Sequence, residues 1–187
     1  MEAAVLTPAV SPPAARSLLI ATVVGTPRPA SPAHVLARAV AERIGARIRS
    51  RTGRAVELES IDLAATAAAS VGAIPTIPSE DVESVERADV VVFASPIRRG
   101  AYTWLLKLFA EALPPRALQG KIAIPVMVAS APRHALTADM HLRPLLLELG
   151  ASCPTPALFT LEQRISDCES LVADWLDRSW PALPRYA

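Results

Sequence analysis

The apolar run Leu18–Val24 and the segment after it constrain the fold more than any other part of the sequence. The run is rich in β-branched residues and predicts a buried strand. A Pro-, Gly- and Ser-containing segment, 25–32, separates it from a helical pattern that begins near Ala33. Such a junction presents unpaired backbone N–H groups and the positive end of a helix dipole, and both favour the binding of an anion. On spacing alone, an ordinary connection capped by Ser31, with Pro32 at the first helical position, is an equally good interpretation.

Apolar runs and helical patterns alternate along the rest of the chain. Alternation of this kind predicts a parallel sheet with helices on both faces and right-handed crossovers. We therefore expect an α/β protein with a doubly wound, five-stranded parallel sheet, in which 55–61 is an edge strand because one of its faces is polar. The further strands are predicted at 90–94, 122–128 and 157–160, and the helices at 33–50, 79–88, 102–113, 136–149 and 165–180.

Ligands of such sheets bind beyond the carboxyl ends of the strands, where the strand order reverses. We expect the loops after three strands to meet there: the first loop (25–32), the second loop (95–101) and the third loop (129–134). The hydroxyls of Thr26 and Ser31 and the guanidinium of Arg28 would bind a phosphate. Arg98 and Arg99 either clamp an anion such as the 2′-phosphate of NADPH or are a solvated pair.

Length and charge limit the organisation and the partners. The 187 residues predict one domain, 17–180, between an Ala- and Pro-rich tail, 1–16, and a short tail, 181–187. The net charge of +1 gives no argument for nucleic acid or a membrane surface, and no apolar run approaches the length that crosses a bilayer. Cys153 and Cys168 lack the spacing of a zinc site, so we expect reduced thiols in a cytoplasmic protein.

Three stretches carry a family resemblance: GTPRPAS after the first strand, SPIRRGAYTWLLKLFAEALPPRALQGK in the middle, and HALTADMHLRPLLLELGA later. They resemble the NADPH-dependent FMN reductase family of the flavodoxin-like superfamily, and especially the reductases of two-component alkanesulfonate monooxygenase systems. The resemblance runs from about Leu18 to Phe159. It implies that NADPH or NADH passes hydride to FMN. The flavin would be either a bound prosthetic group or a substrate handed to a partner monooxygenase.

The resemblance also implies site residues. In the family the first loop holds the flavin phosphate, the second loop supports the ring and the third loop lies against the ring edge. Hydride transfer needs no general base, so no catalytic residue and no metal ligand is assigned. The implied cofactor-binding residues are Thr26, Arg28, Ser31, Ser95, Pro96, Ile97, Arg98, Tyr102, Ala129, Ser130 and His134.

Several residues depart from the family pattern. Ala129 and Ser130 replace two glycines of the third loop, where a β-carbon would press on the ring or alter the turn. Arg98 stands in place of an aromatic residue, and Trp104, in place of a glycine, would either cover the flavin or fill its place. These departures support an alternative function: a family member without a competent flavin site that acts as a non-catalytic binding or assembly partner.

The helix expected at 102–113 favours self-association. Its apolar residues, among them Leu105, Leu108 and Phe109, cover more than one face, and such a helix needs a second surface to bury against. The resemblance points to the same conclusion, since an inserted residue at the position of Tyr102 makes a π-helical bulge at a tetramer interface in the alkanesulfonate-system reductases. We therefore expect a homo-oligomer, either a dimer or a tetramer.

Overall fold

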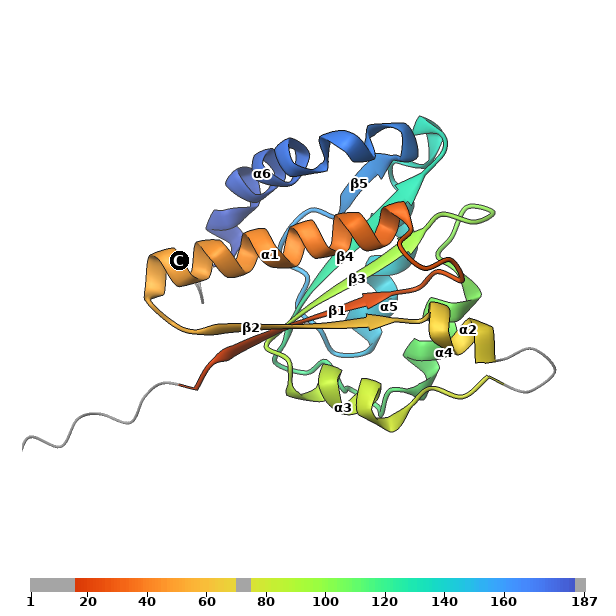
Figure 1. Ribbon diagram of the computed structural model, residues 1–187, viewed down its shortest axis with the longest axis horizontal. Helices are drawn as coiled ribbons and strands as arrows, with labels where there is room; N and C mark the ends of the chain where they lie inside the picture. Colours follow the sequence, from red (N-terminus) through yellow and green to blue (C-terminus); the bar gives the residue numbers. More distant parts are fainter. Residues whose placement is uncertain (1–15, 70–74, 184–187) are drawn as a thin grey trace, which may run out of the picture.

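The computed structural model describes residues 16–69 and 75–183, so the expected N-terminal tail lies outside the described residues except for Arg16. Its centre is a single five-stranded sheet in the order β2-β1-β3-β4-β5, and every neighbouring pair is parallel (Figure 1). This is the flavodoxin-like order, with its switch point between β1 and β3. The predicted fold class and the edge position of β2 are confirmed. The strands are β1 (Leu18–Val24), β2 (Val56–Asp62), β3 (Val90–Pro96), β4 (Ile122–Ala129) and β5 (Leu158–Leu161).

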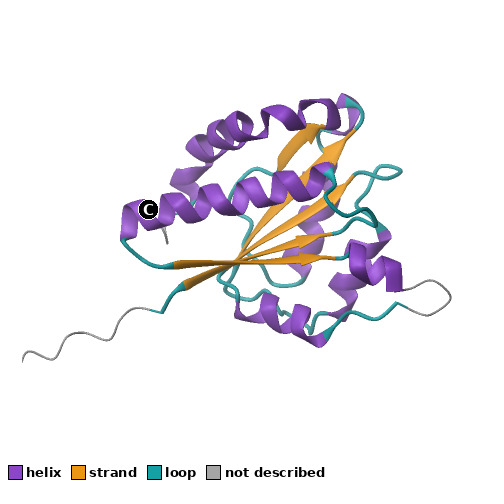
Figure 2. Ribbon diagram, viewed as in Figure 1, coloured by secondary structure: helices purple, strands orange, loops and turns teal. Residues whose placement is uncertain are grey.

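Helices cover both faces of the sheet, as its sequence pattern requires (Figure 2). The central strands β1, β3 and β4 are buried along their whole length, so they have no polar face, whereas β2 is mostly exposed or half-buried. One apolar core lies under α1 (Pro32–Thr52) and α6 (Cys168–Ser179). The other lies under α3 (Ser79–Arg87), α4 (Trp104–Ala112) and α5 (Arg143–Glu148). The short helix α2 (Ala64–Ala69) follows β2.

The ends of α1 follow the signals in the sequence. Ser31 caps the helix through its hydroxyl, which accepts from the His34 N–H, and Pro32 is the first helical residue. Gly53 ends the helix in the left-handed region, at φ 68°, where an L side chain is strained. The start of α3 has no side-chain cap: Ser79 is already helical, and Pro78 precedes it.

The start of α4 also differs from the prediction. Arg98 and Ala101 exchange two backbone hydrogen bonds of 2.8 and 3.1 Å around a tight turn, with φ 50° at Arg99 and 83° at Gly100. Because this turn takes up the last residues of the second loop, the helix begins only after Thr103. The Thr103 hydroxyl accepts a hydrogen bond from the Leu106 N–H. Tyr102 therefore lies outside α4, and α4 has no π-helical bulge of the kind that the resemblance suggested at this position.

A π-helical turn occurs instead before α5, within the segment predicted as one regular helix over 136–149. It spans Ala138–Leu142, and the Arg143 N–H donates to the carbonyl of Ala138, five residues back. Pro144 follows immediately; its ring has no N–H and crowds the carbonyl four residues earlier, which opens the turn.

The C-terminal segment packs further than expected. A 3₁₀ helix over Glu162–Asp167 precedes α6, and a second 3₁₀ turn, Trp180–Ala182, follows it. Leu183 is buried against the α1 and α6 core, so the packed chain continues beyond residue 180. Within residues 16–69 and 75–183, no helix has both the length and the apolar character that a bilayer crossing requires.

Candidate functional site

The first loop is fixed to the neighbouring strand and helix by its glycine. The Gly25 N–H donates to the carbonyl of Ala94 in β3, at 2.8 Å, and the Gly25 carbonyl accepts from the Thr103 hydroxyl, at 2.6 Å. A β-carbon at Gly25 would lie 2.5 Å from Cβ of Leu106 in α4. Only glycine fits this close approach, so the loop is held between β3 and α4.

Two hydroxyls of the first loop are buried yet face a cavity. Thr26 Oγ1 accepts from the Arg28 N–H at 3.3 Å, and Ser31 Oγ accepts from the His34 N–H at 3.4 Å. Both residues are almost fully buried. Because a hydroxyl that accepts one hydrogen bond can still donate another, each retains a donor for a ligand oxygen.

These hydroxyls belong to the first-loop cavity, which has a volume of about 130 Å³. It lies at the β1/β3 switch point and is open enough to admit a phosphate with adjoining atoms. Cavities that enclose a whole drug-sized ligand measure roughly 300 to 1,000 Å³, so the rest of a nucleotide would extend over the rim. The lining residues are Thr26, Arg28, Ser31, Pro32, Ala33, Pro96, Arg98, Val128 and Glu162.

The predicted residues of the second loop divide into two groups. Pro96 and Arg98 line the first-loop cavity, together with the predicted residues of the first loop. Ser95 is buried and outside the lining: its hydroxyl accepts from the Thr103 N–H at 3.0 Å and donates to the Pro96 carbonyl at 2.9 Å. The Ile97 N–H donates to the carbonyl of Val128, at 2.7 Å, and so joins the second loop to β4. Ser95 and Pro96 end β3 rather than begin a loop.

A second cavity of about 230 Å³ shares Arg98 with the first. Tyr102, Thr103, Trp104 and Pro27 complete its lining. The Trp104 side chain is 56% exposed and does not line the first-loop cavity, so it does not fill the place of a phosphate there. Tyr102 is brought beside Arg98 by the tight turn of the second loop, not by a helix.

The third loop is separate from both cavities. Ala129 is the buried last residue of β4 and pairs with Leu161, whereas Ser130 is exposed. His134 ends the short 3₁₀ helix Pro132–His134, and its N–H donates to the carbonyl of Ala131. Neither Ala129 nor Ser130 has a positive φ, so the backbone does not need glycine there for its conformation. The sequence prediction placed Ala129, Ser130 and His134 with the other site residues, and the structure brings none of them to the lining of either cavity.

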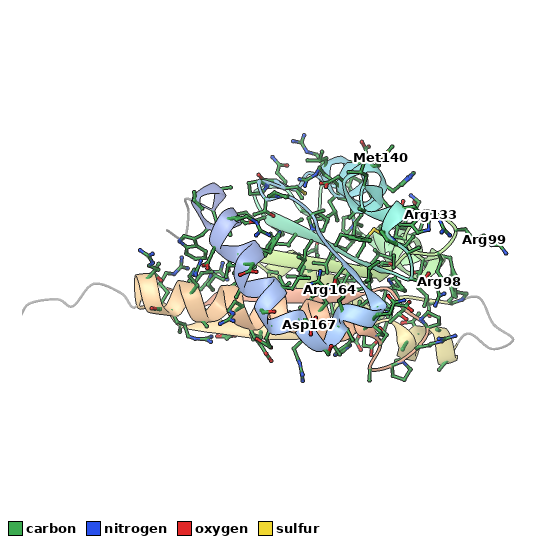
Figure 3. All side chains as sticks on the ribbon, turned by 90° about the horizontal axis from the view of Figure 1, so that it is seen from above. Arg98, Arg99, Arg133, Met140, Arg164 and Asp167 are labelled. Atoms are coloured by element: carbon green, nitrogen blue, oxygen red, sulfur yellow. The ribbon has the colours of Figure 1, made fainter. Side chains whose placement is uncertain are left out.

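Cationic side chains surround the loop end of the sheet. Figure 3 shows Arg98, Arg99 and Arg133 toward the same end of the molecule. In the described part of the chain, neither these three nor Arg28 makes an ion pair with a carboxylate within 4.0 Å, whereas Arg164 pairs with Asp167 at 3.9 Å. Arginines without a carboxylate partner are free to bind an anion bidentately.

Sequence reasoning missed Glu162, which lines the first-loop cavity. Its only signal was its place directly after the last strand, at the carboxyl edge of the sheet.

Outside the two cavities, burial raises the pKa of the Cys153 thiol to about 11, so this cysteine stays protonated at neutral pH and is a poor nucleophile. Over residues 16–69 and 75–183, no cluster of three or more His, Cys, Asp or Glu side chains is arranged to hold a metal ion.

The strand order and the cavity at its switch point define a flavodoxin-like α/β protein with a candidate phosphate site. A profile of the NADPH-dependent FMN reductase family matches residues 18–164, which is more than half of the chain. The chain therefore belongs to the NADPH-dependent FMN reductase family, and the resemblance stated from the sequence is confirmed.

Individual relatives agree with this family. An "FMN reductase (NADPH)" of Escherichia coli is 33% identical over 85 residues, 46% of this chain and 44% of the relative. Another from Pseudomonas aeruginosa is 33% identical over 130 residues, 68% of this chain and 67% of the relative. A solved apo structure of an NADH:FMN oxidoreductase (EMOB) is 27% identical, with a TM-score of 0.69 over 87% of this chain and 88% of that one. The chain thus spans about half the length of the first relative and most of the solved structure.

Proposed function

We propose that this protein is an NAD(P)H-dependent FMN reductase, an oxidoreductase of the cytoplasm. The observation that carries the proposal is the first-loop cavity, which joins two buried hydroxyls and two arginines at the strand-order switch of a chain that belongs to this family. Free Cys153 and Cys168 agree with a reducing compartment.

The residues present fit a flavin phosphate. Thr26 and Ser31 would donate hydroxyl hydrogen bonds to it, and Arg28 would pair with its charge from the rim. Pro96 and Arg98 would flank the remainder of the cofactor where the cavity opens. When bound, FMN supplies the redox chemistry by accepting hydride from a reduced nicotinamide, and the protein supplies orientation and charge.

The nicotinamide nucleotide would approach over the second loop. Arg98 lines the cavity and Arg99 is the next residue of the turn after β3, and a pair of guanidinium groups suits the 2′-phosphate of NADPH. Relatives are named for both nucleotides, since the Escherichia coli protein is an "FMN reductase (NADPH)" and the solved structure an NADH:FMN oxidoreductase. We propose NADPH as the preferred donor because these two arginines lack carboxylate partners within the described residues.

The direct test is a titration of the purified, flavin-stripped protein with FMN, followed by NADPH and NADH oxidation at saturating flavin. Micromolar or tighter binding with turnover supports the reductase. A folded protein that binds no FMN at about 100 μM contradicts it. If NADPH is preferred, changing Arg99 to alanine should lower that preference, and an unchanged ratio would remove Arg99 from the nucleotide site.

A second candidate function is a non-catalytic binding or assembly partner. The observation that favours it is the third loop, because Ala129, Ser130 and His134 line neither cavity. In that case the protein would bind no flavin and would co-purify with an active subunit. The same FMN titration separates the two functions.

We further propose that the protein self-associates and passes reduced flavin to a monooxygenase. Trp104 on α4, Met140 in the π-helical turn and Leu147 on α5 are each more than half exposed, and all three belong to the segments that cover one side of the sheet. Exposed apolar side chains on one side of a sheet favour an interface. Light scattering coupled to size exclusion should give a dimer or a tetramer, and Trp104→Ser should shift it toward the monomer.

A further inference from the structure

Glu162 is the acidic residue in an otherwise neutral and cationic cavity. It follows Leu161, the last residue of β5, and begins the 3₁₀ helix that leads to α6. The pairing of Leu161 with Ala129 sets β5 beside β4, so the carboxyl end of β5 reaches the same edge as the first loop. As a result, Glu162 lines the cavity together with Thr26 and Arg28.

The Glu162 carboxylate is not neutralised by a neighbouring cation. Arg28 and Arg98 line the same cavity, yet in the described segments neither comes within 4.0 Å of it as an ion pair. Arg164, two residues further along the chain, pairs with Asp167 instead. The cavity therefore offers an entering phosphate both attraction from the arginines and repulsion from a carboxylate.

The sign of this interaction is fixed by its chemistry. An ionised carboxylate has only acceptor oxygens, so it cannot donate a hydrogen bond to a phosphate, and like charges repel. The Glu162 side chain is exposed, so solvent screens the repulsion. For an interaction of this kind we expect about a twofold to fivefold effect on affinity, which is the range of exposed charge pairs.

We propose that Glu162 weakens binding of the flavin phosphate and so speeds the release of FMN. This inference rests on the proposed function. A reductase that hands its product to another enzyme must release reduced flavin in each cycle, and a carboxylate beside the phosphate shortens the residence time without removing the hydroxyl and guanidinium donors that orient it.

In the alternative role, Glu162 strengthens FMN binding. Its carboxylate would then turn Arg28 toward the ligand, or accept a hydrogen bond from a ligand hydroxyl. Both versions of that role predict that removing the carboxylate weakens FMN binding, which is the opposite sign. An effect through the hydroxyl would also appear with riboflavin, which has the ribityl chain without the phosphate.

The experiment compares Glu162→Gln and Glu162→Ala with the unchanged protein. The control is Glu148→Gln, which removes the same charge from an exposed position at the end of α5, a residue outside the cavity lining. Dissociation constants for FMN, riboflavin and inorganic phosphate are measured by calorimetry at low and high salt, and the FMN dissociation rate by stopped-flow fluorescence.

Both Glu162 variants should bind FMN and inorganic phosphate about twofold to fivefold more tightly, release FMN more slowly and bind riboflavin unchanged, and the gain should shrink at high salt. Unchanged or weaker FMN binding, or an equal gain with Glu148→Gln, overturns the inference and leaves the reductase intact. If neither the unchanged protein nor any variant binds FMN, the proposed function fails. The role of Glu162 is then decided by inorganic phosphate alone: tighter phosphate binding by the two Glu162 variants supports it, and unchanged binding overturns it.

Discussion

The first and third loops leave the same edge of the sheet, on either side of β3, yet they are built differently. The first loop is held by hydrogen bonds to β3 and to Thr103, the residue that caps α4, and its buried Thr26 and Ser31 line a cavity. The third loop ends a buried strand with an exposed serine, lines neither cavity, and is followed by a π-helical turn. Under the proposed function, this difference predicts that affinity for the phosphate and affinity for the flavin ring can be changed separately.

The largest expected effect comes from the contact that fixes the first loop. Gly25→Ala places a β-carbon 2.5 Å from Leu106 Cβ and 3.1 Å from Leu106 Cα, so the backbone of the loop or of α4 must move. We expect the free energy of unfolding to fall by about 3 kcal/mol, at the upper end of the cost of overpacking. Urea denaturation followed by circular dichroism measures it.

The matched control is another buried glycine. Gly45 lies within α1, and a β-carbon there would meet Val56 Cγ1 at 3.3 Å, a side-chain atom that can move slightly. Because alanine also favours a helix by about 1 kcal/mol over glycine, we expect Gly45→Ala to change stability by less than about 1 kcal/mol. Equal losses for the two variants would show that the first loop is no more tightly held than an ordinary helix.

The next largest loss of stability is expected from Arg143, which holds together the segment that follows the third loop. Arg143 donates to the carbonyls of Cys153 and Thr155 and pairs with Asp139 in the π-helical turn. Arg143→Ala leaves these acceptors without their donor, at a cost of about 2 kcal/mol in unfolding free energy. Arg178→Ala, an exposed arginine of α6, should cost almost nothing. If Arg143→Ala is equally neutral, the segment after the third loop is held by its apolar contacts alone.

The contrast between the loops also explains what the sequence predicted. The strands, α1 with its Ser31 and Gly53 ends, and the first loop were predictable because each depends on contiguous residues. The start of α4 was not, because the positive φ values of Arg99 and Gly100 build a turn that a helical pattern does not reveal. Glu162 was also missed, since it reaches the cavity only through the pairing of β5 with β4.

Substitution of Arg28 tests whether the first loop binds the phosphate, which is one side of the comparison between the two loops. Arg28 lines the first-loop cavity and has no carboxylate partner within the described residues, so Arg28→Ala removes a charge that the fold does not otherwise use. We expect FMN affinity to fall by about tenfold or more, within the range of a charge-assisted hydrogen bond, and riboflavin affinity to stay unchanged. Arg51→Ala, an exposed change at the far end of α1, is the control. An unchanged FMN affinity would remove the first loop from the site.

The smallest effect is expected at the third loop, where Ser130→Gly restores a family glycine. Ser130 is exposed and its φ is not positive, so the change should relieve only crowding of a ligand by the side chain and not backbone strain. We expect FMN and riboflavin to gain affinity equally, by about twofold to threefold, because the contact would be with the ring and not with the phosphate. Fluorescence titration of both flavins measures this, with Ser166→Gly on the exposed 3₁₀ helix before α6 as the control. A gain confined to FMN would contradict the separation of the two loops, because it would place the third loop at the phosphate.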